Sequence, residues 1–352
     1  MKLGIIGLPQ SGKTTIFNAV TRGNTPTTAS AGRMEVHTAV VDVPDARVDK
    51  LSGMFKPRKT IYAKVTYADI AGLEGGAAKS GISGQLLNQL TQMDGFLLVV
   101  RGFADENIPH PAGSVDPRRD VESMLSELLL NDLIAVERKL ERLTEERKKG
   151  GTDKAVNERQ TALFKRLQDA LNANTPLRKL EFNAEESREL ASFGLLTRKP
   201  ILTVFNMGEG QSMPDIQLDH PSVILMGKLE MEIAQLTPED AGLFMKEYGI
   251  EELSLSKMIR LSYDLLQLQS FFTVGEDEVR AWTTRRGASA VESAGEIHTD
   301  LQRGFVRAEV VAYDDLISLG GMNEAKARGK LRLEGKEYPV QDGDIMHVRF
   351  NI

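Results

Sequence analysis

Short apolar runs alternate with polar or helical stretches through the first half of the chain. Several of these runs are rich in Val and Ile and end in Gly, Asp or Asn, which is typical of buried strands in a mostly parallel sheet. Strands that alternate with helices predict an α/β fold with a doubly wound sheet, whose ligand binds beyond the carboxyl ends of the strands. The runs are Lys2–Leu8, Met34–Val43, Ala63–Ile70, Gly95–Arg101, Pro200–Asn206 and Ser222–Met226.

A different pattern lies between the fourth and fifth runs. Apolar residues recur every three or four positions from Leu129 to Leu143, and the opposite face is charged from Glu137 to Lys149. Gly150 and Gly151 interrupt this helix, and a second stripe begins at Leu163. We therefore expect an antiparallel helical hairpin inserted into the α/β domain. Its charges fit either a solvated helix face or an arm that binds a partner.

From about Leu268 the pattern of apolar and polar residues changes. The alternating runs Val306–Val311 and Ile345–Phe350 predict a small β-rich domain, and Asp342-Gly343 is a typical hairpin sequence. The expected organisation is a discontinuous α/β domain (residues 1–120 and 196–267), a helical hairpin (121–195) and a C-terminal domain (268–352).

Composition limits the classes of function. The 352 residues are 41% apolar and 27% charged, which suits a globular protein of two or three domains. A net charge of −6 argues against a general nucleic-acid coat or an anionic-membrane binder, and we expect no DNA specificity. The lack of cysteine excludes disulfides, thiolate metal sites and cysteine nucleophiles. With no signal peptide and no membrane-spanning run visible, we expect a cytoplasmic protein.

Residues 7–14 read Gly-Leu-Pro-Gln-Ser-Gly-Lys-Thr, which fits the phosphate-loop pattern G-x-x-x-x-G-K-[ST] between an apolar strand and an amphipathic helix. The glycines let the loop curl so that successive amides point at an anion. Lys13 supplies positive charge to the β- and γ-phosphates, and the Thr14 hydroxyl is placed to ligate Mg²⁺. We expect ATP or GTP as the ligand and Mg²⁺ as the cofactor. The expected phosphate-binding residues are Gly7, Gln10, Ser11, Gly12, Lys13, Thr14 and Thr15.

A second acidic motif supports the same site. Asp69-Ile70-Ala71-Gly72 ends the third apolar run with the pattern D-x-x-G. The Asp69 carboxylate at a strand end can hold Mg²⁺ through its water shell, and the amide of Gly72 can approach the γ-phosphate. Together with the phosphate loop, this spacing predicts a nucleotide switch.

The fifth run ends in Asn206-Met207-Gly208-Glu209, where guanine-specific switches carry N-K-x-D. Glu209 is one methylene longer than aspartate, so its carboxylate should miss the guanine edge. Met207 replaces the lysine stem that would cover the base with a polarizable apolar surface. The loss of one bidentate contact costs about 1–3 kcal/mol, which is enough to abolish a strong preference for GTP.

The segments GLPQSGKTTIFNAVT, DIAGL and NMGE resemble the YchF subfamily of Obg-like P-loop NTPases. The segments VRAWTTRRGASA, AGEIHTDLQRGF and RLEGKEYPVQDGDIMHVRFN resemble the TGS domain of that subfamily, which has a β-grasp-like fold. The resemblance covers nearly the whole chain. It implies a three-domain ATPase that accepts GTP to a varying degree and associates with ribosomes or translation factors.

The chain departs from the family in two places. The family's phosphate loop usually reads N-V-G-K-S-T, and here Gln10, Ser11 and Thr14 replace three of these residues. Because Gln10 replaces the asparagine, the sequence does not decide whether a monovalent cation binds there. The threonine of the family's first switch, which completes the Mg²⁺ shell, falls on or near Arg33, and an arginine cannot ligate a cation. Other candidates for that ligand are Thr27, Thr28 and Ser30.

Hydrolysis needs a group that orients the attacking water. Many switch GTPases carry glutamine directly after D-x-x-G, whereas this chain has Leu73, as YchF proteins do. His110, in a proline-flanked loop after the fourth run, is our catalytic candidate alongside Lys13, and a solvent-exposed loop histidine is the alternative. Arg33 and Arg101 are weaker candidates for stabilising transition-state charge. The other four histidines show no metal-ligand spacing, so we expect structural roles for them.

Three functions compete. The first is an ATPase or GTPase of low intrinsic rate that reports its nucleotide state to a large partner, the ribosome by resemblance. The second is a nucleotide-dependent regulatory module with negligible hydrolysis. A P-loop kinase is disfavoured, because D-x-x-G with N-x-x-E is not a kinase arrangement. In the C-terminal domain, Trp282, Arg285 and Arg286 fit either an RNA contact or, for the tryptophan, a place in the core.

Overall fold

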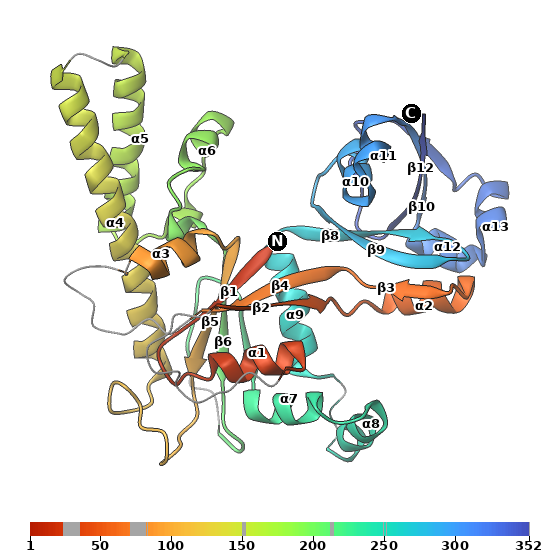
Figure 1. Cartoon of the computed structure of the whole chain (residues 1–352), viewed down its shortest axis with the longest axis horizontal. Helices are drawn as coiled ribbons and strands as arrows, with labels where there is room; N and C mark the ends of the chain where they lie inside the picture. Colours follow the sequence, from red (N-terminus) through yellow and green to blue (C-terminus); the bar gives the residue numbers. More distant parts are fainter. Residues whose placement is uncertain are drawn as a thin grey trace. The chain divides into compact units, whose positions relative to one another are not determined.

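The computed structural model of the chain (Figure 1) describes residues 1–23, 36–70, 82, 84–149, 153–211, 215–248, 250 and 252–351. The chain divides into two compact units. The first unit contains residues 1–39 and 66–255, and the second contains residues 40–65 and 256–352. Residues 40–65 of the second unit thus lie in the sequence between two parts of the first unit. The domain boundaries expected from the sequence stay a prediction.

A six-stranded sheet with the order β2-β4-β1-β5-β6-β7 carries the first unit. The pairs β1–β4, β1–β5, β5–β6 and β6–β7 are parallel. Every apolar run picked out in the sequence contains one of these strands, so the doubly wound α/β prediction is confirmed. The strands are β1 (Lys2–Ile6), β2 (His37–Asp42), β4 (Lys64–Asp69), β5 (Gly95–Arg101), β6 (Ile201–Asn206) and β7 (Ser222–Leu225).

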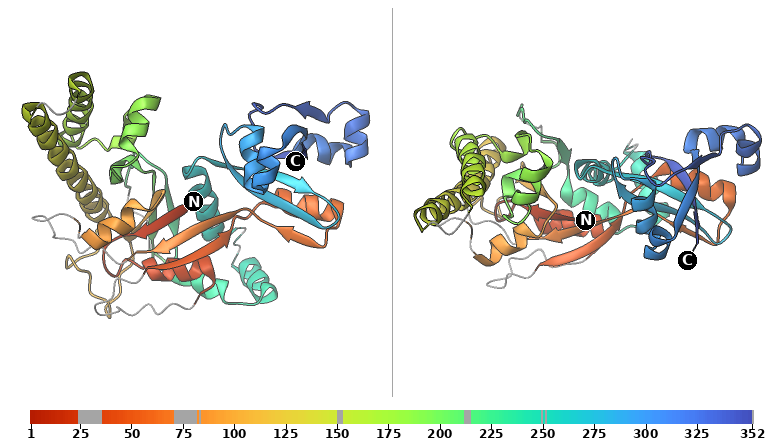
Figure 2. Two further views of the ribbon diagram at one scale, coloured as in Figure 1. Left: turned by 45° about the horizontal axis from the view of Figure 1, so that its top comes forward. Right: turned by 90° about the horizontal axis from the view of Figure 1, so that it is seen from above.

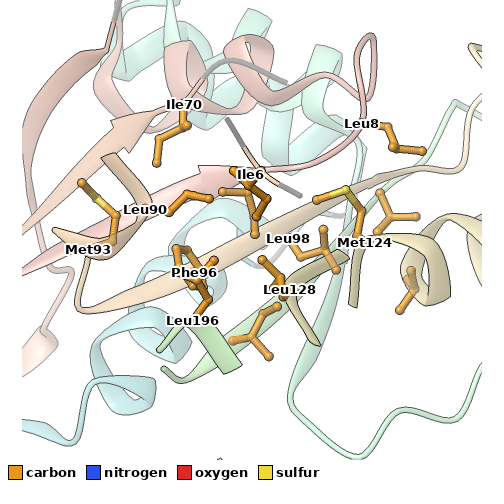
Figure 3. Packing of buried hydrophobic residues seen from close by; sticks show 14 of the residues in the cluster. Ile6, Leu8, Ile70, Leu90, Met93, Phe96, Leu98, Met124, Leu128 and Leu196 are labelled. Carbon is orange, nitrogen blue, oxygen red and sulfur yellow. The ribbon is translucent and has the colours of Figure 1, made fainter. Parts of the chain in front are cut away.

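Helices pack on this sheet because both of its faces are apolar. In Figure 3, Met124 and Leu128 of α4 lie among Phe96 and Leu98 of β5 and Ile6 of β1, and all five are buried. Burying each such side chain contributes about 1.5–3 kcal/mol. The helices of this unit, some of which lie away from the sheet, are α1 (Lys13–Thr21), α3 (Gly84–Thr91), α4 (Pro117–Lys149), α5 (Lys154–Asn172), α6 (Ala184–Leu190), α7 (Gly227–Ala234) and α8 (Pro238–Glu247), with short 3₁₀ turns η1 (Leu177–Lys179) and η2 (Leu196–Arg198).

Helices α4 and α5 form the expected antiparallel hairpin and lie side by side in every view (Figures 1 and 2). Both leucine stripes meet in one apolar cluster, in which Val136, Phe164 and Leu167 are fully buried. Asp132 of α4 ties the hairpin to η2, because its carboxylate accepts hydrogen bonds from the amides of Leu196 (2.8 Å) and Thr197 (2.7 Å). The interrupting Gly150 and Gly151 lie outside the described residues.

The second unit is β-rich, as the sequence predicted. Its sheet has the order β11-β10-β12-β8-β9-β3. The strands are β3 (Lys59–Ile61), β8 (Leu268–Val274), β9 (Glu278–Arg285), β10 (Phe305–Ala312), β11 (Arg332–Glu334) and β12 (Asp344–Phe350). The helices are α2 (Ala46–Phe55), α9 (Ser254–Leu265), α10 (Ala290–Ile297), α11 (Thr299–Arg303), α12 (Tyr313–Leu319) and α13 (Met322–Ala327).

The hairpin predicted at Asp342-Gly343 is wrong, although a turn does form there. The amide of Asp344 donates to Gln341 O (3.1 Å), and Gly343 has a φ of 90° that favours glycine. Strand β12 then pairs with β10 and β8 and not with the chain before the turn. Asp342 turns toward α2, where its carboxylate meets the Arg47 guanidinium at 2.8 Å. In the part of the chain that is described, no helix is both long and apolar enough to cross a membrane.

Candidate phosphate-binding site

Two glycines shape the loop between β1 and α1. Gly7 has a φ of 154° and Gly12 a φ of 91°, both in a region that L side chains rarely adopt. A Cβ on Gly7 would lie 2.3 Å from the carbonyl oxygen of Val99, and one on Gly12 would lie 2.1 Å from Asn206 Nδ2. No side chain caps the start of α1, and no acidic residue lies in its first turn, so its amides remain available to an anion.

Replacing Gly12 with alanine is expected to lower the free energy of unfolding by about 2–5 kcal/mol, because backbone strain adds to the displacement of a buried, hydrogen-bonded amide. Gly210→Ala is the matched control, since Gly210 has a φ of 69° but open space around it. The control should lose only the strain, about 1–2 kcal/mol. Denaturant unfolding measures both variants, and equal losses would contradict the steric argument.

Lys13, the first residue of α1, lies in the loop with its amine buried. Its Nζ donates hydrogen bonds to the carbonyl oxygens of Leu8 (2.8 Å) and Gly7 (3.2 Å). Burial lowers the pKa of this amine to about 8, and the nearby Asp69 carboxylate partly opposes the shift. An anionic phosphate in the loop would favour the charged amine further.

Thr14 and Asp69 meet beside this lysine. The Thr14 hydroxyl donates to Asp69 Oδ2 at 2.8 Å, so the end of β4 and the start of α1 present two oxygen ligands together. Burial raises the pKa of Asp69, while the Thr14 hydrogen bond and the Lys13 charge lower it. A hydroxyl and a carboxylate are ligands that Mg²⁺ prefers, so this pair fits the expected metal.

Asn206 at the end of β6 holds the loop from behind. Its Nδ2 donates to Ser11 O (3.1 Å), and its Oδ1 accepts from the amide of Gly227 at the start of α7 (2.9 Å). One side chain thus joins the loop, the end of β6 and the next helix. The sequence placed Asn206 in the nucleotide site, and the structure gives it this bracing contact.

The two residues expected to set base preference differ in exposure. Met207 is only 6% exposed and belongs to the apolar cluster of the first unit, while Glu209 is exposed to solvent. A Cβ on Gly102 would lie 2.2 Å from Met207 Sδ, which shows how closely the thioether packs there. Of the two side chains, Glu209 is therefore the one free to reach a ligand.

His110 is buried against α4, so the alternative of a solvent-exposed loop histidine is wrong in this conformation. Its side chain is 3% exposed, and its Nε2 lies 2.9 Å from Asp120 Oδ2. The amide of Ala112 donates to His110 Nδ1 (3.1 Å). One ring nitrogen therefore accepts a hydrogen bond, and the other lies close to a carboxylate oxygen.

Arg101 and Asp120 surround this histidine loop. Arg101, at the end of β5, donates from Nη2 to Ile108 O (2.7 Å) and from Nε to Phe103 O (3.0 Å), which gives it a structural task in the loop. Asp120 lies in the first turn of α4 and was not singled out from the sequence. Asp120 is an acidic residue on the buried face of α4, whereas most charges of this helix lie on its outer face. This would identify Asp120 as a functional candidate only once the position of His110 is known.

The remaining predicted residues are placed as follows. Gln10 is exposed in a left-handed conformation (φ 61°), Ser11 is buried, and Thr15 is half-buried in α1. Gly72 and Leu73 lie outside the described residues, as do Arg33 and the first-switch alternatives Thr27, Thr28 and Ser30. Within the described ranges no group of three or more His, Asp or Glu side chains is arranged to hold a metal.

In the second unit the tryptophan is half-buried at the edge of the core. Trp282 packs against the apolar cluster around Phe271, and its Nε1 donates to Thr273 Oγ1 (2.9 Å). The Arg280 guanidinium stacks 3.8 Å from the centroid of its ring. Arg286 is engaged with Asp264 at 2.6 Å, whereas Arg285 is exposed.

Comparison with known proteins agrees with this geometry. Residues 2–139 match the family described as 50S ribosome-binding GTPase, and residues 268–351 match the C-terminal domain of YchF GTPases, described as a protein of unknown function. The ribosome-binding ATPase YchF of Bacillus subtilis (strain 168) is 41% identical over 364 residues, covering 99% of each chain. The chain belongs to the YchF family.

Two further YchF proteins extend the comparison. The ribosome-binding ATPase YchF of Escherichia coli O157:H7 is 39% identical over 363 residues, covering 100% of this chain and 99% of the relative. The solved structure of the Schizosaccharomyces pombe YchF GTPase matches with a TM-score of 0.83 at 31% identity, covering 99% of this chain and 97% of that one. The resemblance inferred from the motifs is confirmed, and this YchF protein is a P-loop nucleoside triphosphatase.

Proposed function

We propose that this YchF protein binds and slowly hydrolyses ATP with Mg²⁺, accepts GTP in part, and couples its nucleotide state to a ribosome or translation factor in the cytoplasm. The observation that carries the proposal is the convergence of Lys13, Thr14 and Asp69 at the start of α1. The names of the Bacillus subtilis and Escherichia coli relatives support the ribosome and the choice of ATP.

The chain's own residues would bind and orient the triphosphate. The loop amides and Lys13 would neutralise the β- and γ-phosphates, with Thr14 and Asp69 holding the metal. When bound, Mg²⁺ supplies positive charge that stabilises the phosphate oxygens. A water oxygen bonds to the γ-phosphorus while the bond to the bridging oxygen breaks, giving ADP and phosphate, and the water proton passes to a phosphate oxygen. His110 is the candidate for orienting that water, and Gly72 for an amide contact to the γ-phosphate.

The ribosome experiment separates this proposal from a regulatory module that hardly hydrolyses. Phosphate release from ATP is measured with and without purified ribosomes, with Lys13→Ala as the background. We expect release above that background and a several-fold stimulation by ribosomes. Release equal to the Lys13→Ala background under both conditions would favour the regulatory module.

Base preference is tested at Glu209, because this side chain is exposed and can be changed without disturbing the core. We expect Glu209→Asp to shift the ratio of ATP to GTP affinity toward GTP by about fivefold or more, since a well-placed carboxylate contact to a base is worth about 1–3 kcal/mol. Calorimetric titration of both nucleotides with Mg²⁺ gives the ratio.

Glu209→Gln is the control, because the amide lacks the charge and keeps the longer stem. It should gain no affinity for GTP. A tenfold or greater preference for GTP in the unmodified protein would overturn our interpretation of Glu209 and Met207.

A further inference from the structure

Three buried polar atoms around one small space lack a hydrogen-bond partner in the described part of the chain. They are Ser11 Oγ in the phosphate loop, Arg101 Nη1 at the end of β5 and Asp120 Oδ2 in α4. All three residues line one narrow gap that has no room for a water molecule, and its other walls are Leu8, Val99, Val100 and Met124. Unsatisfied polar atoms of this kind are rare in a folded core, and a cluster of three calls for an explanation.

The position of His110 supplies part of that explanation. Its Nε2 lies 2.9 Å from Asp120 Oδ2, although the contact is not aligned as a hydrogen bond. The amide of Ala112 donates to Nδ1, so Nδ1 acts as a hydrogen-bond acceptor while Nε2 faces Asp120. In this docked position the imidazole has no free nitrogen with which to contact a water molecule.

Arg119 already donates to Asp120 Oδ1 (2.8 Å), and Arg101 gives the other oxygen, Oδ2, a second possible partner beside His110. The Nε and Nη2 of Arg101 are engaged with backbone carbonyls of the His110 loop, which leaves Nη1 free. Arg101 and Asp120 carry opposite charges and line the same space. Burial lowers the pKa of Arg101, and the attraction of Asp105 and Asp120 opposes that shift.

We propose that Asp120 is a positioning residue whose Oδ2 has two alternative partners. This oxygen holds His110 in a docked, inactive position and pairs with Arg101 when His110 leaves. The proposal rests on the proposed function, in which His110 orients the attacking water. Ser11 lines the same space, so binding of a triphosphate to the loop changes the surroundings of Asp120 directly. The phosphate loop and the release of His110 are thereby coupled through one buried carboxylate.

The first test is a double-mutant cycle on single-turnover ATP hydrolysis. Asp120→Asn keeps the shape but removes the charge that holds His110, so we expect turnover to rise about three- to tenfold by a shift in population. His110→Ala should lower turnover at least about tenfold with nucleotide affinity nearly unchanged. In the His110→Ala background, Asp120→Asn should have no further effect.

Glu122→Gln is the matched control, because it makes the same chemical change two residues along α4 on an exposed side chain. It should leave turnover at the level of the unmodified protein.

The second test observes the imidazole itself by nitrogen NMR, with His110→Ala identifying its signals among the five histidines. The unmodified protein should show Nδ1 of His110 as a hydrogen-bond acceptor. Adding a non-hydrolysable ATP analogue with Mg²⁺, or introducing Asp120→Asn, should move those signals. This readout does not depend on hydrolysis.

The outcomes separate the two proposals. If His110→Ala lowers turnover but Asp120→Asn neither raises it nor moves the ring signals, the positioning role is overturned and the ATPase proposal stands. An equal effect of Asp120→Asn in both backgrounds also overturns the positioning role. If no protein exceeds the Lys13→Ala background, it is the proposed function that fails.

Discussion

Replacing Lys13 with alanine is expected to lower ATP turnover by about a hundredfold or more, because removing one preorganised donor to a developing phosphate charge typically costs that much. Nucleotide affinity should fall with it. The midpoint of thermal unfolding should also fall, because the Lys13 amine donates hydrogen bonds to the carbonyl oxygens of Gly7 and Leu8. Phosphate release and calorimetric binding measure the first two effects.

Lys199→Ala is the comparison for this variant. Lys199 is a second lysine whose pKa burial lowers to about 8, and its amine donates to the carbonyls of Leu90 (2.9 Å) and Thr91 (2.7 Å). Its loss should lower the unfolding midpoint and leave the turnover of folded protein unchanged. Turnover lost equally in both variants would mean that stability, and not the phosphate contact, explains the Lys13 result.

Replacing Asp69 with asparagine is expected to lower turnover by about a hundredfold and to raise the Mg²⁺ concentration needed for half-maximal rate. The amide keeps the hydrogen bond of the Thr14 hydroxyl but removes the charge that draws a divalent cation. A titration of rate against Mg²⁺, started from protein treated with a chelator, measures both effects.

Asp94→Asn is the control for that variant. Asp94 precedes β5 at the opposite end of the sheet, where its exposed carboxylate accepts from the amide of Lys2 (2.7 Å). It should keep the rate and the Mg²⁺ dependence of the unmodified protein. An Asp69→Asn variant with the same Mg²⁺ dependence would remove Asp69 from the metal site.

Local patterns in the sequence were enough to predict the buried strands of the first sheet, the helical hairpin of α4 and α5, and the phosphate loop. Buried strands and amphipathic helices repeat with fixed periods, and the glycines at positions 7 and 12 mark a backbone that only glycine adopts easily. The same holds for Thr14 and Asp69, because the carboxyl end of β4 lies beside that of β1 in a parallel pair.

Contacts between segments far apart in the chain were beyond those patterns. Asp120 is one of many charged residues in α4, and only the fold shows that it lies against His110. Strand β3 has three residues, too few for a periodic signal, and its pairing with β9 spans more than half the chain. The hairpin expected at Asp342 was wrong because β12 pairs with β10 and β8, and a local turn sequence does not encode which strands pair.

The amide of Asn206 has a consequence for attempts to alter specificity. The Asn206 amide group contacts the phosphate loop at Ser11 and the start of α7 at Gly227, and Asn206 itself begins the segment expected to bind the base. A change at this residue would therefore affect phosphate binding and base binding together. Changes meant to alter base preference are therefore best made at the exposed Glu209.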